Sequence, residues 1–103
     1  MRGSTRFDRV LFLLNQKNEQ WEKSKTFGRV VNVSSVEFYN AANAGLRVEM
    51  QFEIYRRLYK NAEKVIYDGS VYSIIRTRKT KNDKLLLICE FLVVDQELLN
   101  EVM

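Results

Sequence analysis

Residues 65–72 read VIYDGSVY, and this stretch decides the class of fold. Asp68-Gly69 stands between two short runs of β-branched and aromatic residues, which is the strongest local signal for a β-hairpin with a two-residue turn. Gly69 tolerates the positive φ of a type I′ turn, and aspartate is among the residue types that enter that region readily. The stretch therefore predicts two antiparallel strands joined at Asp68-Gly69.

More strands are expected on both sides of this hairpin. The return strand runs over 71–77, a basic turn over 78–83 reverses the chain, and a last strand covers 85–93. Before the hairpin, residues 48–55 show the cleanest alternation of apolar and polar side chains. The expected inward positions are Val48, Met50, Phe52 and Ile54, and the outward ones are Glu49, Gln51, Glu53 and Tyr55. This pattern predicts a half-buried strand with one solvated face.

The N-terminal third is expected to add two strands, over 7–14 and 27–33. Both faces of the first are largely apolar, so this strand should be central or covered. The residues between them, 15–25, are mostly polar and contain the only tryptophan of the chain. They predict an extended loop in which Trp21 folds back on the barrel.

A helix is predicted over Ser34–Gly45, between the second and third strands. Ser34 and Glu37 have the spacing of a reciprocal capping box, and Gly45 is the residue type that commonly ends a helix. One side of this helix is apolar. The other side leaves Glu37, Tyr39, Asn40 and Asn43 for solvent or a partner.

The fold class that follows is mainly β: a small antiparallel β-barrel or sandwich with one α-helix inserted between strands 2 and 3. The 103 residues predict a single domain, with a leader at 1–5 and a helix-compatible tail at 94–103. The outer face of the last strand carries Leu86, Ile88 and Leu92, which is too apolar to be left in water. Either the tail or another subunit is expected to cover that face.

The composition argues against catalysis. The chain has no histidine and only one cysteine, Cys89, so the usual general bases, nucleophile pairs and zinc ligands are mostly missing. The four glycines are isolated, which excludes a phosphate-cradling loop. No catalytic residue, metal site or cofactor is therefore expected, and binding or architecture remains.

The net charge and the hydropathy of the chain indicate which partners and which cellular location to expect. The net charge of +4 favours contact with a polyanion without requiring it. No apolar run approaches the roughly 20 residues of a membrane span, so no membrane is expected and the protein should be made and used in the cytosol.

The order of these features resembles the head–tail joining (head-closure) proteins of long-tailed bacteriophages. The resemblance covers about residues 6–92, almost the whole chain. Its most specific parts are the motif Tyr-Asp-Gly-x-x-Tyr-x-Ile at Tyr67–Ile74 and the motif Glu-Phe-Tyr-x-Ala at Glu37–Ala41.

The resemblance implies a structural virion protein. Copies would form a ring beneath the portal and its adaptor, close the DNA-filled head, continue the DNA channel and present the surface on which the tail docks. The implied partners are the portal or adaptor ring, tail-completion proteins, further copies of the chain and the passing DNA. The implied location is the head–tail interface, after synthesis in the bacterial cytoplasm.

Two groups of residues are the expected contacts in such a ring. Subunit contacts are assigned to Tyr39, Asn40, Asn43 and Arg47 around the helix and to Leu86, Ile88 and Leu92 on the last strand. Positions facing the DNA channel are assigned to Arg76, Arg78, Lys79 and Lys81.

A barrel of the oligonucleotide-binding type that holds single-stranded nucleic acid is the alternative. In such barrels exposed aromatic rings stack on bases inside a basic groove. The residues available for that role are Tyr55, Tyr59, Tyr67 and Tyr72 with Arg56, Arg57, Arg76 and Arg78. Tyrosines in hairpins are more often cross-strand packing, which favours the structural role. An accessory domain of a larger enzyme is a third possibility.

Overall fold

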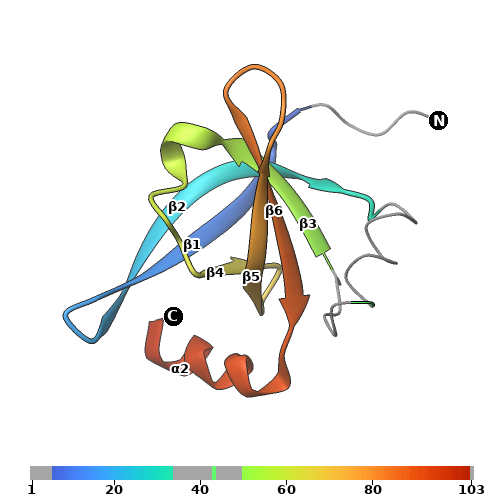
Figure 1. Cartoon of the computed structure of the whole chain (residues 1–103). Coiled ribbons are helices and arrows are strands. Elements are labelled where there is room, and N and C mark those ends of the chain that lie inside the picture. Colours follow the sequence, from blue (N-terminus) through green and yellow to red (C-terminus); the bar gives the residue numbers. More distant parts are fainter. Residues whose placement is uncertain (1–5, 34–42, 44–49, 103) are drawn as a thin grey trace.

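A computed structural model describes residues 6–33, Asn43 and 50–102, and six strands among them close into an antiparallel barrel (Figure 1). The strands are β1 (Arg9–Lys17), β2 (Gln20–Val31), β3 (Met50–Tyr55), β4 (Lys64–Tyr67), β5 (Ser70–Lys79) and β6 (Lys84–Phe91). Their order around the barrel is β1-β2-β3-β6-β5-β4, with β4 pairing back onto β1. The prediction of a mainly β, antiparallel barrel is confirmed.

The hairpin at Asp68-Gly69 forms as the sequence indicates. Both turn residues have positive φ, 51° at Asp68 and 79° at Gly69, and Tyr67 pairs with Ser70 across the turn. Local turn chemistry alone accounts for this hairpin, since the two residue types at the turn are those that adopt such φ values most easily.

The loop predicted over residues 15–25 is wrong. The chain instead makes a second two-residue hairpin, in which Asn18 and Glu19 both have positive φ and β1 pairs with β2 from Arg9–Gly28 to Lys17–Gln20. Trp21 does lie against the barrel, but within β2 and on its outer surface. The first part of β2 is polar, but it forms a strand because it pairs with the apolar strand β1.

The helix predicted between the second and third strands lies outside the described residues, apart from Asn43, which is exposed. The α-helix within the described residues is α2 (Leu99–Val102), which follows the 3₁₀ segment η2 (Val93–Leu98). A short 3₁₀ turn, η1 (Arg56–Leu58), follows β3. The tail is therefore helical, as its sequence allows.

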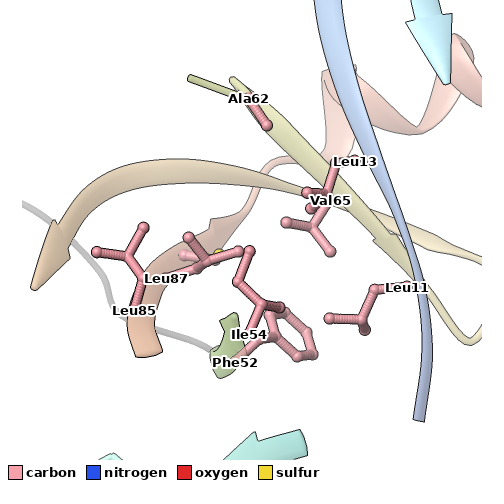
Figure 2. Close-up of a cluster of buried hydrophobic side chains, with 9 residues drawn as sticks. Leu11, Leu13, Phe52, Ile54, Ala62, Val65, Leu85 and Leu87 are labelled. Atoms are coloured by element: carbon pink, nitrogen blue, oxygen red, sulfur yellow. The ribbon is translucent and has the colours of Figure 1, made fainter. Parts of the chain in front are cut away.

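The interior of the barrel is filled by side chains of β1, β3, β4 and β6 together with Ala62 (Figure 2), and Val30 of β2 and Ile74 of β5 pack against them. Phe52 lies among them with no exposed surface, and the rings of Tyr67 and Tyr72 meet it edge-on at 5.2 and 5.9 Å between centroids. The cluster consists of Leu11, Leu13, Phe52, Ile54, Ala62, Val65, Leu85, Leu87 and Cys89. Burial raises the pKa of the Cys89 thiol, so it behaves as a small apolar side chain.

A second cluster lies outside the barrel, where η2 and α2 cover β1, β4 and β5. Leu14, Ile66 and Val71 are buried there beneath Leu98, Leu99 and Val102. The side-chain amide of Gln96 anchors the tail: its Nε2 donates to Val71 O at 2.8 Å, and its Oε1 accepts from Val71 N at 3.0 Å. The tail thus explains why both faces of β1 are apolar.

The tail was one of the two covers expected for the outer face of β6, and it instead covers β1, β4 and β5. Leu86 and Ile88 are buried, and the side chains packed against them are Val31, Val33 and Ile75. Ile75 lies on this face because it follows the inward-facing Ile74. The β-bulge between Ile74 and Arg76 shifts the pairing of β5 with β6 by one residue, so that Arg76 also lies opposite Ile88.

The outer face of β3 also departs from its pattern. Gln51 and Glu53 were expected in solvent but are 2% and 7% exposed. The carboxylate of Glu53 is retained at a buried position because the side chains of Arg29 and Thr80 supply charged and polar partners.

Candidate binding surface

Of the residues expected in subunit contacts, the structure describes Asn43, Leu86, Ile88 and Leu92. Tyr39, Asn40 and Arg47 lie outside the described residues, and Asn43 is exposed. Of the three apolar positions on the last strand, only Leu92 is exposed, at 37%, while Leu86 and Ile88 are buried within the subunit. Their role in subunit contact stays a prediction.

The residues expected to face a DNA channel lie on β5 and the turn that follows it. Arg76, Arg78, Lys79 and Lys81 are all exposed. Arg76 pairs with Ile88 and Arg78 with Leu86, so both arginines extend over the outer face of the barrel. They form a basic edge on the outside of the barrel.

The tyrosines expected in a nucleic-acid groove are mostly in the core. Tyr59, Tyr67 and Tyr72 pack against the interior cluster, as cross-strand packing predicts. Burial raises the pKa of Tyr59. Tyr55 alone of the four is exposed, at 36%.

Tyr55 belongs to a surface that the sequence did not reveal, which we call the basic aromatic groove. It is an open groove of about 610 Å³ at the end of the barrel where β1 and β6 begin and β3 ends. Figure 1 shows η1 and the β5–β6 turn at this end and α2 at the other. Its lining residues are Arg6, Phe7, Lys25, Thr26, Phe27, Tyr55, Arg57, Leu58 and Lys84.

The rings and cations of the groove are interleaved. Phe7 and Tyr55 lie 4.8 Å apart between ring centroids, at an angle of 45°. A cation lies over each of the three rings: Arg57 over Tyr55 at 4.8 Å, Lys84 over Phe7 at 5.2 Å and Lys25 over Phe27 at 5.5 Å. Such contacts hold a positive charge beside an apolar surface and do not neutralise it.

Asp83 fixes the segment that carries Arg57. Its backbone oxygen accepts a hydrogen bond from Arg56 N at 2.9 Å, and its carboxylate lies 3.2 Å from the Arg56 guanidinium and 3.9 Å from that of Arg57. These bonds tie η1 to the β5–β6 turn. Asp83 has a positive φ of 63°, which aspartate tolerates better than most residues.

The wall between β2 and β3 is held by a buried carboxylate. Glu53 accepts hydrogen bonds from Arg29 Nε and Thr80 Oγ1, both at 2.7 Å. Burial by itself would raise the pKa of Glu53, but these two bonds and the charges of Arg29 and Lys84 outweigh it, and the pKa lies below its usual value. Glu53 is therefore ionised and links β2, β3 and the β5–β6 turn.

β2 and β3 separate immediately beside the groove. Only Arg29, Val30 and Val31 of β2 pair with β3, whereas residues 20–28 pair with β1. The edge of β2 that faces away from β1 therefore has no strand partner over 20–28 within the described part of the chain. Lys25, Thr26 and Phe27, at the end of this open edge, line the groove.

The described residues show no arrangement typical of a metal centre. Within 6–33, Asn43 and 50–102, no group of three or more histidine, cysteine, aspartate or glutamate side chains could hold an ion. None of the helices described is long and apolar enough to cross a membrane.

Comparison with protein-family models and with curated proteins returned no match. The chemistry of the surface is therefore the guide to function: exposed rings, exposed cations and an open strand edge, which suit binding of an anionic or extended partner.

Proposed function

We propose that the protein is a structural subunit of a bacteriophage head–tail connector, which closes the DNA-filled head and provides the surface for tail docking. The closed antiparallel barrel carries this proposal, because it is the architecture that the motif order at Tyr67–Ile74 and Glu37–Ala41 implies. The role is architectural and not enzymatic, and further copies of the chain, the portal or adaptor ring and tail-completion proteins are its partners. The virion is its location.

The construction of the barrel supports an architectural role. Its interior is occupied by side chains of the buried cluster, so it stores no ligand, and its functional surface is the outside. A ring needs two different faces on each subunit that meet head to tail. In the proposed ring the predicted helix, with Tyr39, Asn40, Asn43 and Arg47, supplies one contact, and Arg76, Arg78, Lys79 and Lys81 face the channel.

Deletion of the gene from its phage tests the proposal. Tailless heads that have lost their DNA, seen by electron microscopy with the DNA content of the capsids measured in parallel, are the expected result. Normal tailed virions that retain their DNA would refute it. Complementation with the unaltered gene is the control that assigns the defect to this chain.

Binding of single-stranded nucleic acid is a second candidate function. The exposed cations of β5 and its turn, Arg78, Lys79 and Lys81, are the observation that favours it. Affinity for an oligonucleotide should then fall steeply with salt concentration, and replacing these three residues by glutamate should reduce the slope. Weak binding that is insensitive to the substitutions would exclude this role.

A further inference from the structure

We propose that the basic aromatic groove and the adjoining open edge of β2 bind an extended, acidic segment of a partner protein by strand addition. This inference does not rest on the connector role. The groove and the strand edge both belong to a single copy of the chain, so peptide binding can be measured on the purified protein alone. Three features support it: the open edge of β2, the positive charge of the groove, and the contacts that its aromatic rings already make.

The open edge favours an extended polypeptide. A strand paired on one side only presents unpaired backbone N–H and C=O groups, which an incoming strand can match. Over residues 24–27 β2 pairs with β1 on one side, and no described strand pairs with its other side. Glu22, Lys23, Ser24 and Lys25 are all exposed, so an added strand would meet no covering layer there.

The charge of the groove favours an acidic segment. Arg6, Lys25, Arg57 and Lys84 line it, and among the described residues no aspartate or glutamate lines it; the carboxylate of Asp83, outside the lining, lies 3.9 Å from the Arg57 guanidinium. Lysines on an edge strand normally oppose pairing with neutral or basic strands, and here they select for carboxylates. Phe27, which is 49% exposed, and Leu58 offer an apolar surface for every second side chain of the added strand.

The aromatic rings favour a peptide over nucleic acid. Base stacking needs an open ring face. Tyr55 already contacts Phe7 and the Arg57 guanidinium, Phe7 carries the Lys84 ammonium, and Phe27 carries that of Lys25. The rings thus position cations for carboxylates and are poorly arranged as platforms for successive bases.

Titration with two labelled peptides tests the inference. Each has about eight residues, the length of an ordinary strand; one alternates glutamate with valine and phenylalanine, and the other has lysine in place of glutamate. Fluorescence anisotropy should show saturable binding of the acidic peptide only. Lys25→Glu should weaken that binding about tenfold, because it places a like charge in the groove.

Lys79→Glu is the matched control, since it makes the same change of charge at an exposed site on β5 outside the groove. It should leave affinity within about twofold, because its side chain does not line the groove. Circular dichroism of both variants verifies that the barrel is folded.

Amide hydrogen exchange separates strand addition from simple ion pairing. The saturating acidic peptide should slow exchange at alternate amides within Ser24–Phe27, and these residues should show the largest NMR shifts. Binding without this protection, equal loss in Lys25→Glu and Lys79→Glu, or tighter binding of an oligothymidine of equal charge would overturn the proposal. Concentration-dependent self-association through the same amides would also overturn it, since the occupant would then be a second copy of the chain.

Discussion

At the scale of single residues, the wall of the barrel depends on positions where β2 and β3 meet. Gly28 of β2 lies so close to β3 that a Cβ atom there would stand 2.6 Å from the Glu53 carbonyl oxygen and 2.9 Å from side-chain carbons of Leu11 and Ile54. The missing side chain lets the strands approach before they separate beside the groove. The backbone of β3 at Glu53 could not move away from an added Cβ atom as the end of a flexible side chain could.

Gly28→Ala is therefore expected to destabilise the fold by about 1–3 kcal/mol, the usual effect of overpacking. Urea unfolding followed by circular dichroism measures the change. Ser24→Ala, at an exposed position of the same strand, is the control and should stay within about 0.5 kcal/mol of the parent. A fully stable Gly28→Ala variant would show that β2 and β3 are farther apart than described.

Glu53 makes the stability of the fold depend on pH. Its pKa is lower in the folded chain than the ordinary value of 4.5, so its ionised form stabilises the fold above that value, and the stabilisation is lost as the pH falls through the folded-state pKa. Glu53→Gln should cost about 1–3 kcal/mol at neutral pH, because Arg29 loses its charged partner.

The difference between Glu53→Gln and the parent should shrink towards zero in acid, where the carboxyl group of the parent is itself neutral. Urea unfolding of both proteins at several pH values between neutral and acid measures this difference. A difference independent of pH would mean that the group contributes by shape and not by charge.

At the scale of elements, the C-terminal segment acts as a covering layer attached through one side chain. Val71 lies on β5 just before the stretch that pairs with β6, and Gln96 satisfies both its N–H and its C=O. Gln96 also donates to Leu92 O at 3.0 Å, which closes the turn into η2. The segment is short, so its helical state depends on this anchor and on Leu98, Leu99 and Val102.

Gln96→Ala should destabilise the protein by about 1–3 kcal/mol, since it leaves partly buried backbone groups of Val71 unpaired. Hydrogen exchange at the Val71 amide should become faster while exchange in the barrel interior is little changed. Glu97→Ala, exposed in the same segment, is the comparison and should alter neither. Unchanged exchange at Val71 in Gln96→Ala would show that the amide is protected by something else.

The two hairpins differ in whether their turn residues alone predict them. The Asp68-Gly69 hairpin was predictable because its two turn residues favour positive φ by themselves. The hairpin at Asn18-Glu19 was not, because glutamate gives no turn signal and the strand that follows is polar. It forms because β1 pairs with it, which is information held elsewhere in the chain.

At the scale of the whole molecule, closure of the barrel isolates its interior from solvent. Cys89 has no exposed surface, and burial raises the pKa of its thiol. Since the thiolate is the reactive form, both effects suppress its chemistry in the folded state.

Reaction of Cys89 with a thiol reagent such as Ellman's reagent should therefore follow opening of the barrel. The rate should be very low in buffer, rise with sub-denaturing urea, and reach that of a free thiol in the unfolded chain. Gly28→Ala should accelerate it so that the logarithm of the rate rises in proportion to the stability lost, provided that opening is at equilibrium. Rapid labelling of the stable native protein would contradict the closed barrel.

The candidate site exists only in the folded molecule as a whole. The basic aromatic groove is assembled from four separate parts of the chain, at residues 6–7, 25–27, 55–58 and 84. Sequence reasoning had singled out Tyr55 and Arg57 but grouped them with Tyr59, Tyr67 and Tyr72, which pack against the interior cluster. No local pattern links Lys25 or Lys84 to them.

Local sequence was enough to predict the strand-rich class, the Asp68-Gly69 turn, the helical tendency of the tail and the scarcity of catalytic side chains. These depend on residue type and short-range spacing, which act between neighbours in the chain. Only the tertiary structure decided the closure of the barrel, the burial of Glu53, the face that the tail covers and the groove beside the open edge of β2. Those features depend on contacts between residues far apart in the chain, which exist only once the strands have paired.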